Sequence, residues 1–151
     1  MIAEKEAVRI EAWVKEACED GAKLLTGGTR SGAYFAPTIL TDTKPGTKVI
    51  CRETFAPVFS IMPYDTIDEA IASVNASTYG LQAGVFTSSL EIAHACAEKI
   101  QAGCVIINDG ATFRMDNMPY GGVKDSGIGR EGPAWAIREL TEEKLVVFNF
   151  S

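Results

Sequence analysis

The stretch from residue 58 to residue 108 constrains the fold most, because strand-like and helix-like patterns alternate along it. Two helical patterns, opened by predicted capping boxes at 66–69 and 88–91, separate three apolar runs of strand length. Such alternation favours parallel pairing through crossover connections, and near-continuous apolar strands favour a sheet covered on both faces. The sequence therefore predicts an α/β fold with a parallel sheet and helices on both faces, its strands being residues 58–62, 84–87 and 104–108.

The residues before this stretch predict one helix and several short strands. Apolar residues spaced four and three apart predict an amphipathic helix over residues 3–19, which Gly21 is expected to end. Pro37 lies inside one of the strands that follow, so that strand is expected at a sheet edge. The predicted strands are residues 23–26, 34–40 and 49–51.

After residue 108, a long connection rich in glycine and polar residues leads to the last two elements. A loop of this length in a compact domain usually has a function. Pro133 suits the first turn of a helix that runs to about Leu140. The apolar run at 144–150 predicts a terminal strand.

Charge and hydropathy exclude several classes of partner. The chain has 14 basic and 20 acidic residues, a net charge of −6, which disfavours nucleic acid and anionic membranes. The longest apolar stretch is too short to cross a bilayer, and the first residues carry no signal-peptide pattern. The single histidine and the lack of a C-x-x-C pair predict no metal site. Reduced thiols in a cytoplasmic protein are expected for the four cysteines, Cys18, Cys51, Cys96 and Cys104.

Three candidate motifs have a simpler structural interpretation. Residues 127–132 match the dinucleotide fingerprint G-x-G-x-x-G, but the residues before them do not read as a strand. Glycines that turn the backbone before the last helix are therefore favoured. Cys51 beside Arg52 is a weak candidate for a reactive thiol, since no base can be assigned to it. His94 is expected on a solvated helix surface.

The segment Glu-Thr-Phe-Ala-Pro at 53–57 places an acid and an aromatic residue on one side of a bend before a buried strand. Carboxylates bind ribose hydroxyls, and aromatic rings stack on planar cofactors. Glu53 and Phe55 are therefore candidate cofactor-binding residues. The alternative is a turn with a packed phenylalanine.

Four segments, in order along the chain, resemble motifs of aldehyde dehydrogenases. Arg-Glu-Thr-Phe-Ala-Pro at 52–57 resembles the family's Glu-x-Phe-Gly-Pro motif, and residues 79–87 resemble Tyr-Gly-Leu-x-Ala-x-Val-Phe-Thr. Asn108 and residues 118–131 resemble Asn…Pro-Phe-Gly-Gly-x-Lys-x-Ser-Gly-x-Gly-Arg-Glu. The chain thus resembles the C-terminal part of the catalytic domain of NAD(P)-dependent aldehyde dehydrogenases. That resemblance assigns residues 1–142 to the catalytic domain and residues 143–151 to an oligomerisation strand.

The resemblance also implies roles for particular residues. Glu53 would hold the nicotinamide ribose of NAD or NADP, and Phe55 would pack against the nicotinamide. The loop at 109–120 would line the substrate tunnel, with Phe113, Arg114 and Tyr120 as candidates. Arg114 could anchor a carboxylate or phosphate, because a guanidinium binds such anions with two donors; the alternative is a surface pair with Asp116.

The sequence departs from the family pattern at three of these positions. Ala56 replaces the usual glycine and could alter the bend that presents Phe55. Arg52 replaces a common acid, and Tyr120 replaces the commoner phenylalanine.

The family's catalytic cysteine, general-base glutamate, oxyanion-hole asparagine and Rossmann domain have no counterpart among the matched segments. No aldehyde oxidation and weak or no NAD(P) binding are therefore expected of this chain alone. The alternative role is a structural protein that self-associates or binds full-length subunits; a small enzyme of another chemistry is disfavoured. In the family the terminal strand extends the sheet of a dimer mate. A homodimer is therefore expected, in which residues 144–150 pair with residues 104–108 of the mate.

Overall fold

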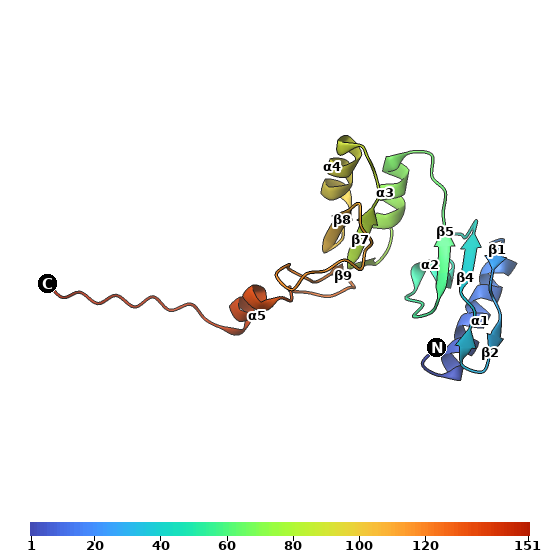
Figure 1. Cartoon of the computed structure of the whole chain (residues 1–151), viewed down its shortest axis with the longest axis horizontal. Coiled ribbons are helices and arrows are strands. Elements are labelled where there is room, and N and C mark those ends of the chain that lie inside the picture. Colours follow the sequence, from blue (N-terminus) through green and yellow to red (C-terminus); the bar gives the residue numbers. More distant parts are fainter. The chain divides into compact units, whose positions relative to one another are not determined.

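The computed structural model describes residues 1–151. The chain divides into two compact units, Met1–Asp65 and Thr66–Ser151, whose elements are labelled in Figure 1. No helix has the length and apolar character needed to cross a bilayer.

The first unit combines one long helix with a three-stranded sheet. In the sheet, β4 lies between β1 and β5, antiparallel to β1 and parallel to β5. A two-stranded hairpin, β2 with β3, and one helical turn complete the unit. The elements are α1 (Glu4–Glu19), β1 (Lys23–Thr26), β2 (Arg30–Ser31), β3 (Tyr34–Phe35), β4 (Thr38–Thr41), α2 (Lys48–Cys51) and β5 (Val58–Ile61).

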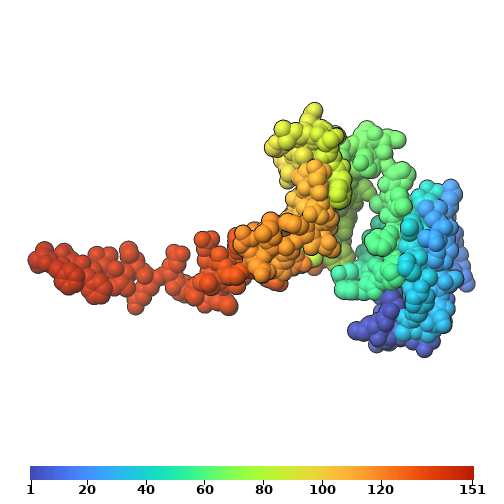
Figure 2. Space-filling model, in the orientation of Figure 1, coloured from blue at the N-terminus to red at the C-terminus, as the bar shows by residue number.

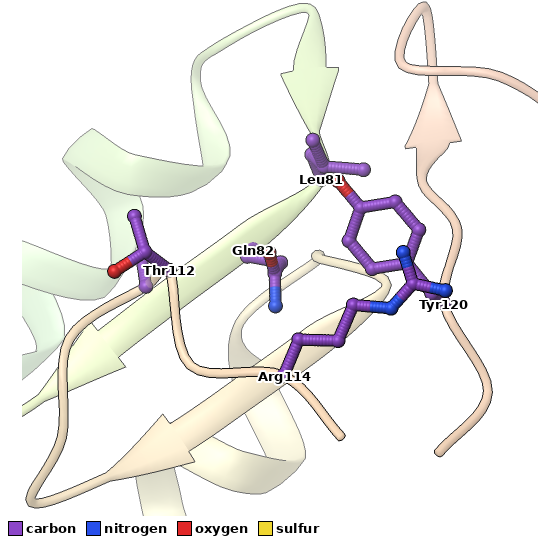
Figure 3. Close-up of a pocket in the computed structure, with 6 residues that line it drawn as sticks. Leu81, Gln82, Thr112, Arg114 and Tyr120 are labelled. Carbon is purple, nitrogen blue, oxygen red and sulfur yellow. The ribbon is translucent and has the colours of Figure 1, made fainter. Parts of the chain in front are cut away.

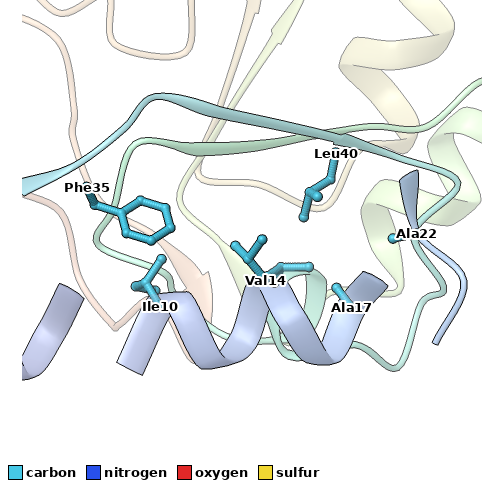
Figure 4. Close-up of a cluster of buried hydrophobic side chains, with 7 residues drawn as sticks. Ile10, Val14, Ala17, Ala22, Phe35 and Leu40 are labelled. Carbon is cyan, nitrogen blue, oxygen red and sulfur yellow. The ribbon is translucent and has the colours of Figure 1, made fainter. Parts of the chain in front are cut away.

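The core of this unit lies between α1 and the strands. The predicted apolar stripe of α1 is confirmed, since its buried residues are Ala7, Ile10, Val14 and Ala17. Figure 4 shows Ile10 and Val14 directed toward Phe35 and Leu40. Burial of one such aliphatic side chain contributes about 1.5–3 kcal/mol, so this contact holds α1 firmly on its unit.

Two strand predictions in this unit are wrong. Residues 49–51 belong to the helical turn α2, in which the Cys51 and Arg52 amides donate to the Thr47 and Lys48 carbonyls. Pro37 interrupts the predicted strand 34–40, and β4 starts at the next residue as the central strand rather than an edge. Because Pro37 precedes β4, its missing N–H leaves the β4 ladder intact.

The second unit contains a parallel strand pair joined by a helix. The crossover through α4 is the predicted one, and β7 pairs with β8. The first predicted strand of the series, however, is β5, which pairs with β4. The elements are α3 (Ile67–Asn75), β6 (Tyr79–Gly80), β7 (Gln82–Val85), α4 (Leu90–Lys99), β8 (Cys104–Ile107), β9 (Val123–Lys124) and α5 (Pro133–Leu140).

Local signals place the starts of these elements. Thr66 caps α3 as predicted, accepting a hydrogen bond of 3.2 Å from the Glu69 amide. The cap of α4 lies one residue later than predicted, since Ser89 accepts from the Ile92 amide at 3.3 Å. Gly103, the residue before β8, lies against another backbone segment: a Cβ there would be 1.7 Å from the Gly121 carbonyl oxygen.

The glycine string at 127–132 is a series of turns. Its glycines have φ values of +123°, +75° and +117°, and Gly132 leads into α5. The residues before the string do include a short strand, β9, contrary to the sequence prediction. The Arg130 amide, however, donates to a Glu139 carboxylate oxygen at 3.1 Å. An acid thus occupies a donor that a phosphate would need, which favours the structural interpretation.

The last residues form no strand within the chain. The predicted strand 144–150 is extended but has no ladder partner. Figure 2 shows the red terminal segment clear of the rest of its own unit. Its apolar side chains are 57–91% exposed, namely Leu145, Val146, Val147, Phe148 and Phe150.

Candidate functional site

The loop between α2 and β5 carries the two predicted cofactor residues on the surface of the first unit. Phe55 has a left-handed backbone, with φ +47°, and its side chain is 77% exposed. Glu53 is exposed and makes no hydrogen bond or ion pair. A solvent-exposed, unpaired carboxylate can accept hydrogen bonds from the ribose of a nicotinamide nucleoside, and the exposed aromatic ring beside it can pack on the flat nicotinamide ring. Their cofactor role stays a prediction.

Two contacts hold this loop on its unit. On the β5 side, the Pro57 carbonyl accepts a hydrogen bond of 2.8 Å from the Thr38 amide. On the α1 side, Arg9 donates to the Thr54 carbonyl at 2.9 Å. Arg9 could not be linked to this loop from local sequence patterns, because 45 positions separate it from Thr54.

A cavity of about 430 Å³ lies in the second unit beside the predicted tunnel loop. Figure 3 shows Arg114 reaching across it to Tyr120, and the Arg114 Cζ atom lies 4.3 Å from the centre of the Tyr120 ring. Two of the predicted tunnel residues thus meet in one pocket. The cavity is lined by Leu81, Gln82, Ala111, Thr112, Arg114 and Tyr120.

Short-range and cross-loop hydrogen bonds build the walls of this cavity. The Phe113 amide closes a turn on the Gly110 carbonyl at 3.0 Å, and Gln82 Nε2 donates to the Phe113 carbonyl at 3.4 Å. Tyr120 is fixed through its backbone pairing with Glu131. Phe113 therefore contributes its main chain to the loop, and its ring is not among the lining groups.

Arg114 has no close carboxylate partner. Its NH1 atom lies 4.0 Å from Glu131 Oε2, and the Glu131 side chain is 74% exposed. A surface pair of this length is worth little, whereas stacking on an aromatic ring contributes about 0.5–1 kcal/mol. The alternative partner, Asp116, makes no ion pair with Arg114. The guanidinium is thus oriented by a ring and keeps donors for an anion.

Sequence reasoning missed Leu81 and Gln82 as lining residues, and it did not single out Ala111 and Thr112 within the predicted loop 109–120. Gln82 was detectable in principle, because it is a polar residue at the start of an otherwise apolar strand. The groups with displaced pKa values lie elsewhere. Asp42 raises the pKa of Lys23 through a hydrogen bond, and Asp68 raises the pKa of Lys99 in the same way.

None of the four cysteines is paired with a base. Cys51 is exposed, and its thiol donates to the Gly46 carbonyl over 3.6 Å. Cys96 is buried, whereas Cys18 and Cys104 are half-buried. His94 is exposed on α4, as predicted.

Residues 1–146 match the sequence pattern of the aldehyde dehydrogenase family. The chain belongs to this family. This aldehyde dehydrogenase chain is 54% identical to 3-sulfolactaldehyde dehydrogenase from Priestia megaterium over 149 residues. The matched region covers 99% of this chain and 31% of the relative. The chain therefore spans about a third of the length of the relative.

Solved aldehyde dehydrogenases share the fold. Aldehyde dehydrogenase 21 from Physcomitrella patens, in complex with the reaction product succinate, is 44% identical with a TM-score of 0.91 over 94% of this chain and 30% of its own. Glyceraldehyde-3-phosphate dehydrogenase from Methanocaldococcus jannaschii, complexed with NADP, is 42% identical with a TM-score of 0.87. The match covers 92% of this chain and 30% of that protein. The predicted family and its α/β fold are confirmed.

Proposed function

We propose that this chain supplies a nicotinamide-binding loop and an anion-binding subsite to an aldehyde dehydrogenase that oxidises a short, negatively charged aldehyde. The proposed negatively charged substrate is supported mainly by the position of Arg114. Its guanidinium faces a cavity, stacks on Tyr120 and lies 4.0 Å from its one acidic neighbour. A planar guanidinium binds carboxylate, sulfonate or phosphate oxygens with two parallel donors.

The named relatives support this substrate class. Their names and ligands include a sulfo-aldehyde, the dicarboxylate succinate and an aldehyde phosphate. These molecules differ in the acid group but share a small size and a negative charge. An arginine binds all three acid types, because its positive charge and its planar N–H donors match the oxygens of a sulfonate, a carboxylate or a phosphate.

Glu53 and Phe55 are proposed to hold the nicotinamide riboside of NAD or NADP. When bound, this cofactor accepts the hydride that leaves the aldehyde carbon. The exposed Glu53 carboxylate would accept hydrogen bonds from ribose hydroxyls, and the Phe55 ring would cover one nicotinamide face. A cytoplasmic location is part of the proposal and rests on the four free cysteines.

A chimera tests the substrate class. Residues 1–151 would replace the matching segment of 3-sulfolactaldehyde dehydrogenase, so that the complete catalytic machinery is present. Arg114→Ala should raise the KM for anionic aldehydes by about 10- to 100-fold, because one charge-assisted contact is worth about 1.5–3 kcal/mol. The KM for a neutral aldehyde of similar length should change less than about twofold.

Arg138→Ala is the matched control, since Arg138 carries the same charge on α5 and does not line the cavity. It should leave both KM values unchanged. Equal effects of Arg114→Ala on charged and neutral aldehydes would contradict an anion subsite and indicate a general packing role.

The terminal segment supports a second proposal, self-association through strand exchange. Residues 144–150 are extended and unpaired, and β8 pairs with β7 along one edge only. The Phe148 and Phe150 rings stack with centroids 6.1 Å apart, as alternate residues of a strand do. We propose that residues 144–150 pair with residues 104–108 of a second copy, giving a reciprocal homodimer.

Deletion of residues 144–151 should convert this dimer to monomer in sedimentation velocity experiments. Val147→Pro should weaken the dimer as well, because proline removes a backbone donor from the ladder. Val147→Thr keeps the donor and the β-branched side chain, and it should preserve the dimer. A dimer that survives both the deletion and the proline would place the interface elsewhere.

A further inference from the structure

Arg9 connects α1 to the loop that carries Glu53 and Phe55. One terminal nitrogen of its guanidinium donates to the Thr54 carbonyl oxygen at 2.9 Å. In the chain, this carbonyl lies between the two candidate cofactor residues. The hydrogen bond therefore fixes the Thr54–Phe55 peptide group, which leads directly into Phe55 and follows Glu53 by one residue.

The Arg9 side chain is itself held on two sides. Its Nε donates to Glu6 Oε2 at 2.7 Å, and its Cζ lies 4.4 Å from the centre of the Trp13 ring. Glu6, Arg9 and Trp13 share one face of α1, at positions i, i+3 and i+7. The guanidinium is thus oriented before it meets the loop, so little side-chain entropy is lost in making the third contact.

The two ends of this link differ in rigidity. α1 is anchored by its buried stripe, in which Ala7 and Ile10 are fully buried. The loop, in contrast, carries Phe55 in a left-handed backbone, which is unfavourable for a bulky residue unless neighbouring contacts hold it. Arg9 supplies such a contact one residue before Phe55.

We propose that Arg9 is a positioning residue for the cofactor, which holds the Thr54 carbonyl so that Glu53 and Phe55 face the nicotinamide riboside. This inference rests on the proposed function of the loop. In this proposal Arg9 acts only by positioning Glu53 and Phe55, and it does not contact the reacting atoms. The competing role for Arg9 is a tie that stabilises α1 and does nothing for the cofactor.

The test uses the same chimera and separates cofactor binding from stability. Arg9→Met, which keeps an apolar stem without donors, should raise the KM for NAD+ or NADP+ by about tenfold. The KM for the aldehyde and the melting temperature should change little. Arg9→Lys should recover part of the cofactor affinity, because one ammonium donor can still reach a carbonyl.

Arg30→Met is the matched control. Arg30 is also a half-buried arginine bound to α1, donating to Glu11 at 2.9 Å and to Glu4 at 3.2 Å, and it does not contact the loop. It should leave the KM for the cofactor unchanged. If Arg9→Met and Arg30→Met affect that KM equally, Arg9 is a structural tie and the inference fails.

Glu53→Gln separates this inference from the proposed function. It should raise the KM for the cofactor, because a carboxylate accepts ribose hydroxyl donors more strongly than an amide oxygen does. If Glu53→Gln has no effect, the loop does not bind the cofactor, and the proposed function fails together with the role of Arg9. If Glu53→Gln is effective and Arg9→Met is silent, the positioning role alone is overturned.

Discussion

The purified 151-residue chain is expected to oxidise no aldehyde at a measurable rate, whichever of NAD+ or NADP+ is supplied. In the family reaction a thiolate adds to the aldehyde carbon, and the resulting thiohemiacetal loses a hydride to the nicotinamide. The chain offers no thiol with a base beside it, since Cys51 donates to a carbonyl and Cys96 is buried. Loss of a covalent nucleophile lowers turnover by a factor on the order of 10⁴ to 10⁶.

The measurement is the absorbance of the reduced cofactor, with anionic and neutral aldehydes as substrates. The chimera described above is the positive control under the same conditions. Turnover by the isolated chain that disappears in Cys51→Ala would contradict the expectation and would make Cys51 a nucleophile.

A second large effect is expected at Gly103, where two backbone segments meet at the start of β8. A Cβ at this position would lie 1.7 Å from the Gly121 oxygen and 2.8 Å from the Gly121 carbon. Because both are backbone atoms, no rotamer change relieves the overlap. Gly103→Ala should therefore cost about 3 kcal/mol or more of unfolding free energy and lower the Tm of the second unit by roughly 10–20 °C.

Thermal unfolding followed by circular dichroism measures this effect. Gly110→Ala is the matched control in the same unit, because its Cβ would meet nothing closer than 3.7 Å. It should shift the Tm by no more than a few degrees. Equal Tm values for the two variants would show that the contact between residues 103 and 121 does not form in solution.

Features that depend on a short repeat in the sequence could be predicted. The helical spacing of α1 identified its buried face because four apolar residues recur on one side over the length of the helix. Arg114 and Tyr120 were both placed on the candidate tunnel loop by the family resemblance, whereas the contact between their side chains is seen only in the structure. The four matched segments identified the family for the same reason, since each motif is local.

Features that depend on distant residues could not be predicted. The link from Arg9 to Thr54 joins positions 45 residues apart, and neither residue signals the other. The run 49–51 is too short to show a period, so its β-branched residues favoured a strand where the chain makes a helical turn. Residues 144–150 have strand-like composition, but a strand needs a ladder, and this chain supplies none for them.

In this loop Phe55 has a left-handed backbone conformation and Ala56 does not. This difference decides which substitutions each of the two positions accepts in evolution. Position 56 carries no positive φ, so the alanine that stands where the family usually has glycine introduces no strain there, and its side chain packs against the core. Glycine, alanine and serine should therefore interchange at 56 among close homologues. At 55, a branched residue such as isoleucine would add steric cost to an already unfavourable φ, which leaves unbranched aromatic residues favoured.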